Sequence, residues 1–72
     1  MLYWLFVNEN RVAEWPSIES CQSQARSYDG ADLKWERADN GPQGNAPHWY
    51  ATGRRRGPLS DPYYYMIVEI AD

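Results

Sequence analysis

The longest apolar stretches lie at the two ends of the chain. Residues 63–70 (YYYMIVEI) and residues 1–7 (MLYWLFV) contain no Gly or Pro and are rich in aromatic and branched side chains. This composition favours β-strands. Neither stretch alternates between apolar and polar positions. We therefore predict that the two pair at the centre of a sheet that is apolar on both faces.

Shorter patterns predict a hairpin and a helix after the first strand. Residues 8–11 are suited to a turn, residues 12–15 resume an extended pattern, and Pro16 ends that second strand. Ser17 is placed to cap a helix that stops at the Asp-Gly pair of residues 29–30. One face of this helix carries apolar residues at helical spacing, namely Ile18, Cys21, Ala25 and Tyr28.

The second half of the chain predicts two more strands and two long loops. Residues 33–37 form a third strand with Leu33 and Trp35 on the core side, and residues 48–52 form a fourth. Turn-forming residues fill the connections 39–47 and 53–62. The prediction is a single α+β domain over residues 1–72, ordered β-β-α-β-β-β, with a mostly antiparallel sheet and one helix on one face.

A single helix leaves one face of this sheet without a cover. Eleven helical residues are about 16 Å long, which is enough for one face only. Exposed apolar surface on a small protein usually marks an association site. The sequence does not decide which side faces the helix. We therefore expect the contact surface for a partner, or for a second copy in a homodimer, to include Trp4, Phe6, Trp49, Tyr63, Tyr65 and Ile67.

The residues that could carry catalysis are few and scattered. One Cys and one His among 72 residues supply neither a disulfide nor a metal set, so no metal or cofactor is predicted. Cys21 lies on the apolar helical stripe and is interpreted as a core residue, and His48 as an edge or surface residue. We assign Asp29 and Asp32 to turns or caps and Glu69 to the solvated rim. The sequence therefore predicts a protein that is not an enzyme.

Charge is concentrated at one place. Arg54, Arg55 and Arg56 stand between two glycines, and aromatic residues flank the loop that holds them. Guanidinium groups bind phosphate or carboxylate, and bases stack on aromatic rings, so a single-stranded nucleic-acid binder is the alternative function. The net charge of −3 argues against a general duplex-DNA binder.

Two further sequence features bear on where the protein works. Residues 1–7 lack the basic flank, cleavage site and length of a signal peptide or membrane anchor, which predicts a cytoplasmic protein. Arg supplies most of the basic residues, and Trp, Gly, Ala and Pro are plentiful. All have GC-rich codons, which favours a bacterium with a GC-rich genome, or one of its phages, as the source.

The layout as a whole resembles a known class. A chain of this size begins directly in residues 1–7, passes through residues 15–19 (WPSIE) into one short helix and finishes in residues 63–70. In this it is similar to the small accessory proteins of bacteriophages, among them the anti-CRISPR proteins. The resemblance implies stoichiometric inhibition of a host protein or ribonucleoprotein complex by occlusion of a binding surface. It assigns no individual residue.

Overall fold

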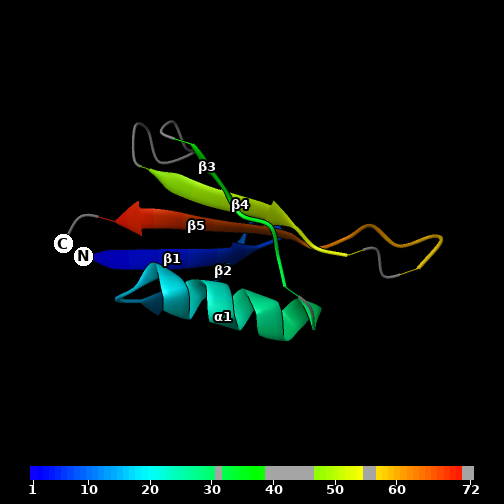
Figure 1. Cartoon of the computed structure of the whole chain (residues 1–72), viewed down its shortest axis with the longest axis horizontal. Coiled ribbons are helices and arrows are strands. Elements are labelled where there is room, and N and C mark those ends of the chain that lie inside the picture. Colours follow the sequence, from blue (N-terminus) through cyan, green and yellow to red (C-terminus); the bar gives the residue numbers. More distant parts are fainter. Residues whose placement is uncertain (31, 39–46, 55–56, 71–72) are drawn as a thin grey trace.

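The computed structural model describes residues 1–30, 32–38, 47–54 and 57–70. These residues form a single small α+β domain in the predicted order β-β-α-β-β-β (Figure 1). Its elements are β1 (Leu2–Val7), β2 (Asn10–Trp15), α1 (Ile18–Asp29), β3 (Glu36–Ala38), β4 (His48–Thr52) and β5 (Tyr64–Ile70).

The sheet is antiparallel, with the strand order β2-β1-β5-β4-β3. The predicted pairing of the two terminal stretches is confirmed: β1 pairs with β5 from Leu2 opposite Ile70 to Val7 opposite Tyr65. β5 is the central strand, and both ends of the described chain meet at the same end of the sheet (Figure 1).

The β1–β2 hairpin forms as predicted, with a tight turn at Asn8 and Glu9. Both residues have positive φ angles, 50° and 73°. Two central residues with positive φ match the right-handed twist of the flanking strands. β2 begins at Asn10, two residues earlier than predicted, because so short a turn leaves Asn10 and Arg11 free to pair.

The predicted limits of the helix are confirmed. Ser17 is the N-cap, and its Oγ accepts a hydrogen bond of 3.2 Å from the backbone N–H of Ser20. Gly30 takes a left-handed conformation with φ of 73° and donates its N–H to the carbonyl of Arg26. A residue with a Cβ would be strained there, so Gly30 stops the helix.

The core lies between α1 and the sheet. Leu5, Cys21, Ala25, Tyr65 and Ile67 are all fully buried and form one cluster. The interpretation of Cys21 as a core residue is confirmed, and burial raises the pKa of its thiol to about 11. A thiol with so high a pKa stays protonated at neutral pH and is a poor nucleophile.

Two predictions about the end of the helix are wrong. Tyr28 is 42% exposed and not part of the core stripe, whereas Asp29, expected in a turn or cap, is only 1% exposed. Both residues border the buried side of the helix, Tyr28 nearer to Cys21 and Asp29 nearer to Ala25, so helical position alone does not decide which of them is buried. Asp29 Oδ2 accepts from the backbone N–H of Arg54 at 3.2 Å, and Oδ1 from the Tyr65 hydroxyl at 3.4 Å.

The predicted strand 33–37 is also wrong in its limits. Only Glu36–Ala38 pairs, with β4, because residues 32–35 cross over the sheet on the helix side before they reach its edge (Figure 1). All the strands of the described residues belong to the one sheet, so residues 32–35 have no strand beside them with which to pair. The prediction that Leu33 and Trp35 face the core is confirmed, because both pack against the core cluster.

The connection from β4 to β5 extends beyond the sheet at the end away from the start of β1 (Figure 1). At its base the Gly53 N–H donates to the carbonyl of Tyr63 at 2.7 Å. Near its tip Gly57 and Ser60 bridge each other, and Leu59 is fully exposed.

The predicted loop 39–47 lies outside the described residues except for Pro47. Within the described part of the chain, no helix has the length and apolar character to cross a membrane.

Candidate binding face

The sheet side opposite α1 is the candidate functional surface, and we call it the open face. Strand register places directly opposite residues on the same side. Trp4 lies opposite Val68, which lies opposite His48, and Phe6 lies opposite Met66, which lies opposite Tyr50. The non-charged side chains of strands β1, β4 and β5 on this face include Leu2, Trp4, Phe6, His48, Tyr50, Tyr64, Met66, Val68 and Ile70.

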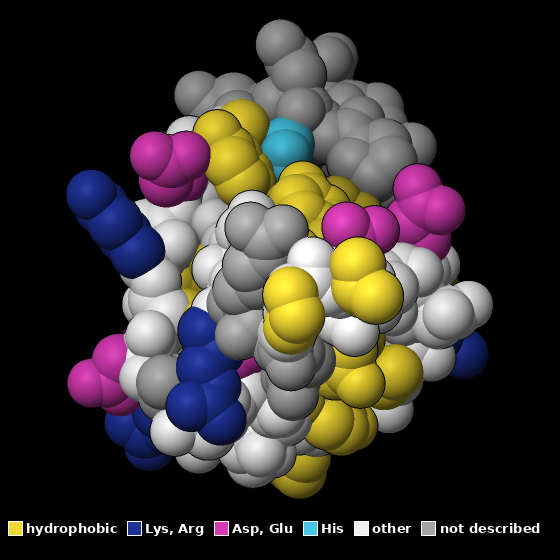
Figure 2. Space-filling model, turned by 90° about the vertical axis from the view of Figure 1, so that its right-hand side faces the viewer, with side chains coloured by type: hydrophobic (Ala, Val, Ile, Leu, Met, Phe, Trp, Pro, Cys, Tyr) yellow, Lys and Arg dark blue, Asp and Glu magenta, His cyan; other side chains and the backbone are white. Residues whose placement is uncertain are grey.

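The middle of the open face is apolar, and the side chains around the middle are accessible to solvent. Val68 is fully buried and His48 is 7% exposed, whereas Tyr64 is 41% exposed. Trp4, Phe6, Tyr50 and Met66, among others on this face, are partly exposed. Seen from the end that carries the β4–β5 connection, the molecule exposes hydrophobic side chains between its charged ones (Figure 2).

A β-bulge orients Trp4. Leu5 pairs with Ala13 but Phe6 pairs with Arg11, so Val12 is an extra residue in β2. The bulge brings Arg11 and Glu14 to the same side of the sheet, although an odd number of positions separates them. Trp4 Nε1 donates to Glu14 Oε1 at 2.8 Å, and the Arg11 guanidinium carbon lies 4.7 Å from the Trp4 ring centroid. The indole is thus held in one orientation.

Tyr50 and His48 lie on the β4 side of the open face. The Tyr50 hydroxyl bonds to Glu36, and this hydrogen bond, together with the charge of Glu36, raises the pKa of Tyr50. The His48 ring lies 5.9 Å from the Tyr50 ring, tilted by 31°. Among the described residues, His48 Nδ1 finds no hydrogen-bond partner. Because His48 is only 7% exposed, it is a buried residue of the sheet, and the prediction of an edge or surface position is wrong.

The predicted contact set is divided between the two faces. Trp4 and Phe6 lie on the open face, as their register shows. Trp49 and Tyr63 pack partly buried against the helix-side core. Tyr65 and Ile67 are fully buried in that core, so their prediction as contact residues is wrong. The strand alternation defines two sets of residues, but only the position of α1 decides which set it covers.

The sequence reasoning therefore missed open-face residues that alternate with the ones it chose. Tyr64, Met66 and Val68 share this face with Trp4, and Tyr50 joins them from β4. No signal in the sequence separates the two sets, because large aromatic residues stand on both sides of the strands: Tyr64 lies on the open face and Tyr65 on the helix side.

The three tyrosines of residues 63–65 do not all face the same side of the sheet. Arg55 and Arg56 lie outside the described residues, and the Arg54 side chain is exposed. Tyr63 and Tyr65 form an edge-on pair on the helix side with ring centroids 6.3 Å apart, while Tyr64 points to the open face. The three rings therefore do not offer one continuous surface beside Arg54.

Glu69 is partly buried and lies near a hydroxyl. The Tyr3 hydroxyl donates to Glu69 Oε1 at 3.5 Å, and burial, with a smaller effect of Glu69, raises the pKa of Tyr3. Asp32 is exposed and pairs with Arg26 at 3.4 Å. Among the described residues, no three His, Cys, Asp or Glu side chains lie together as a metal set.

No protein-family model, curated protein or solved structure matches this chain. The structure defines its class as a small single-domain α+β protein.

Proposed function

We propose that this protein is a non-catalytic binding module that docks on another macromolecule through the open face. One observation carries the proposal: the central strands present partly exposed aromatic and apolar side chains on the side that α1 does not cover. Tryptophan and tyrosine are the residues that contribute most often to the energetic centre of a protein interface.

The aromatic side chains of the open face are suited to burial against a partner. Each aromatic ring buries on the order of 150–250 Å², and burial contributes about 25 cal/mol per Å² of apolar area. The Trp4 N–H already bonds to Glu14, so a partner that covers the indole leaves no unsatisfied donor. Because Arg11 and Glu14 fix the ring, less side-chain entropy is lost on binding.

The proposed target is a host protein or ribonucleoprotein complex in the bacterial cytoplasm, inhibited by occlusion of one of its binding surfaces. The resemblance to small phage accessory proteins supports this choice. The net charge of −3 supports it further, because an acidic protein is attracted to the basic grooves that bind nucleic acid.

The test is affinity capture from the lysate of a GC-rich bacterium with three forms of the protein. The wild type is compared with a Tyr50→Lys/Tyr64→Lys variant and with Leu59→Lys, a control at the fully exposed tip of the β4–β5 connection. We expect one multisubunit complex to be retained by the wild type and by Leu59→Lys and to be lost with the open-face variant. Equal capture by all three proteins, or by none, contradicts the proposal.

A filter-binding assay examines the nucleic-acid alternative. We expect no retention of a mixed single-stranded oligonucleotide at low salt. Retention that disappears when Arg54, Arg55 and Arg56 are all changed to Ala would favour the alternative and displace the open face as the functional surface.

A further inference from the structure

Two rows of side chains cross all five strands on the open face. Directly opposite residues of neighbouring strands lie on the same side of a sheet. From the β2 edge to the β3 edge, the first row consists of Arg11, Phe6, Met66, Tyr50 and Glu36. The second row consists of Glu14, Trp4, Val68, His48 and Ala38. The first row is therefore apolar or aromatic in its middle, with a basic residue at one end and an acidic residue at the other.

The charges at the two ends of the first row cannot pair within one chain. Arg11 and Glu36 lie on the two edge strands, which four strand spacings of about 4.8 Å separate by about 19 Å. Both residues are exposed. The Arg11 guanidinium stacks on Trp4, and Glu36 accepts from the Tyr50 hydroxyl, but these contacts use only part of their hydrogen-bonding capacity. Each residue can therefore bind an opposite charge on another molecule.

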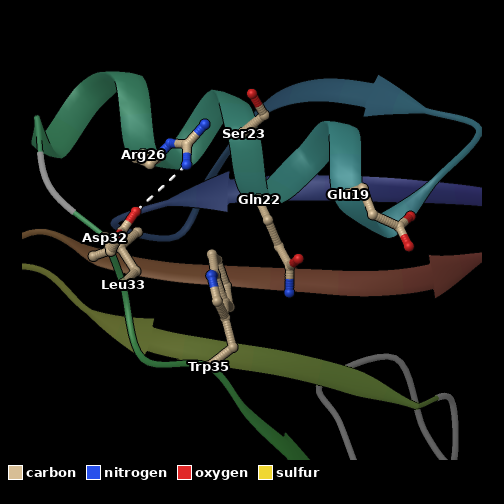
Figure 3. Close-up of a pocket in the computed structure, with 7 residues that line it drawn as sticks. All are labelled: Glu19, Gln22, Ser23, Arg26, Asp32, Leu33 and Trp35. Atoms are coloured by element: carbon tan, nitrogen blue, oxygen red, sulfur yellow. Dashed lines mark hydrogen bonds and ion pairs between the residues drawn. The ribbon is translucent and has the colours of Figure 1, made fainter.

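The helix side of the sheet is different, because an acidic and a basic residue there pair within the chain. Between α1 and residues 32–35 lies a shallow groove of about 270 Å³ with a mostly polar lining (Figure 3). At one end of this groove Arg26 of the helix pairs with Asp32 at 3.4 Å. The open face is instead the side that combines an aromatic middle with opposite charges at separate edges.

We infer that the open face binds a second copy of the chain, face to face, about a two-fold axis that runs along β5. β5 is the middle strand of the five. This axis therefore sets each residue of a row against the residue at the same distance on the other side of β5 in the partner. Arg11 then faces the partner's Glu36, and Glu36 faces the partner's Arg11. Phe6 faces the partner's Tyr50, and Met66 faces the partner's Met66.

The second row is compatible with the same axis. Trp4 faces the partner's His48, Val68 faces the partner's Val68, and Glu14 faces the partner's Ala38. No two like charges are opposed in either row. Two sheets that pack face to face keep their strands within about 30° of each other at a separation of about 10 Å, which the aromatic and aliphatic side chains of both copies would fill.

The order of the charges selects a second copy over an unrelated protein. A complementary partner needs an apolar middle, an acid opposite Arg11 and a base opposite Glu36, with about 19 Å between the two charges. The open face itself has all of these features in the required order.

The size of the open face limits the strength of the dimer. A width of about 19 Å and a length of about 23 Å for the seven residues of β5 give an area of about 440 Å². Stable interfaces bury about 800 Å² on each partner, so we expect a weak dimer that forms at tens to hundreds of micromolar.

This inference uses the face on which the proposed function rests and adds a competing occupant to it. The dimer covers the aromatic side chains at high protein concentration, and dilution exposes them to the target. The two proposals fail separately. A monomer that still captures a host complex overturns only the dimer, and a dimer that captures no complex overturns only the proposed function.

The first test compares two tyrosines of matched exposure, Tyr64 at 41% on the open face and Tyr28 at 42% on α1. Tyr64 belongs to β5, so Tyr64→Lys sets two lysines close to each other beside the axis. Sedimentation equilibrium of the full chain is expected to give a dimer mass for the wild type and for Tyr28→Lys, and a monomer mass for Tyr64→Lys. A wild-type monomer at every concentration overturns the inference, and so does a dimer that only Tyr28→Lys disrupts.

The second test exchanges the charges at the ends of the first row. Arg11→Glu opposes two acidic residues and Glu36→Arg opposes two basic ones, so each variant alone is expected to associate several-fold more weakly than the wild type at low salt. An equimolar mixture of the two variants is expected to recover the wild-type association constant, because both end contacts of the mixed dimer join opposite charges. Thermal unfolding checks the fold of each variant. A mixture that associates no better than its components, with both folds intact, overturns the arrangement.

Two neutral variants provide a matched control for the direction of the axis. Glu36→Gln and Glu14→Gln each remove one charge and keep an oxygen that accepts the existing hydrogen bond from Tyr50 or Trp4. Only Glu36→Gln is expected to weaken the dimer at low salt, because Glu14 faces the partner's Ala38. An equal effect of the two variants, or a larger effect of Glu14→Gln, overturns an axis along β5.

Discussion

The close contact between Gly53 and the buried carboxyl of Asp29 predicts a large effect of Gly53→Ala. A Cβ at position 53 would overlap Asp29 Oδ1 and would lie 3.0 Å from Asp29 Cγ and 3.1 Å from Tyr65 Cε2. Neither neighbour has space to move, because Asp29 is 1% exposed and Tyr65 is fully buried. The added methyl group must therefore displace the carboxyl or the backbone.

The magnitude follows from the contacts that would be lost. Overpacking a buried site costs about 1–3 kcal/mol. Displacement of the carboxyl also weakens its hydrogen bonds to the Arg54 N–H and the Tyr65 hydroxyl, at about 1 kcal/mol each. We expect Gly53→Ala to lower the free energy of unfolding by about 3 kcal/mol, which in a domain of this size lowers the Tm by about 15 °C.

The measurement is urea unfolding followed by tryptophan fluorescence, with Gly57→Ala as the matched control. Among the described residues, a Cβ on Gly57 comes within 4 Å only of Ser60 Oγ, at 3.9 Å, so this variant is expected to unfold like the wild type. In an Asp29→Ala background the overlap disappears, and the cost of Gly53→Ala should fall to about 1 kcal/mol, the remainder from the Tyr65 ring. Wild-type stability of Gly53→Ala, or an equal cost in both backgrounds, would refute the reasoning.

Three other changes test local features of the fold. Glu9→Gly relieves the positive φ of 73° in the β1–β2 turn and is expected to raise the free energy of unfolding by about 0.5–1 kcal/mol, measured by urea unfolding. Ser17→Ala removes the N-cap of α1 and should lower the free energy of unfolding by about 1 kcal/mol. Ser27→Ala on the outer helix surface is the control, and it is expected to leave the free energy of unfolding almost unchanged. Burial raises the pKa of Cys21 to about 11 from the 9.0 of a free thiol, so the native state holds this proton more tightly than the unfolded state. The stability contribution of the protonated thiol is complete below pH 9 and decreases as pH rises towards 11, so Cys21→Ala should lose less stability than the wild type over that range. Equal losses in the two proteins would contradict the assignment.

Local signals were strong enough to predict most of the elements. Ser17 and Gly30 bound the helix because capping depends on a few neighbouring residues. The pairing of residues 1–7 with the final strand followed from their shared apolar, β-favouring composition. The strand limits near Leu33 and Trp35 could not be predicted, because they depend on the path of the chain across the sheet and not on the alternation of its side chains.

The candidate site depended more heavily on tertiary structure. Alternation along β5 separates Tyr65 and Ile67 from Tyr64 and Met66 in the sequence itself, but the packing of α1 decides which pair is buried. The packing of α1 thus buries Tyr65 and Ile67, which were predicted as contact residues, and leaves Tyr64 and Met66 on the open face. The bulge at Val12 is equally non-local, since only its pairing with β1 brings Arg11 and Glu14 to the same side of Trp4.

The sequence by itself determined most of the secondary structure, the order of its elements and the existence of an apolar sheet face beyond the reach of one short helix. These properties follow from composition, periodicity and capping, which act over a few residues. Only the tertiary structure decided which face stays open and buried Asp29 beneath the β4–β5 connection. It also aligned Trp15 and Tyr28 along α1 through Gln24. Contacts between residues distant in the chain depend on the packing of whole elements, and no local pattern specifies them.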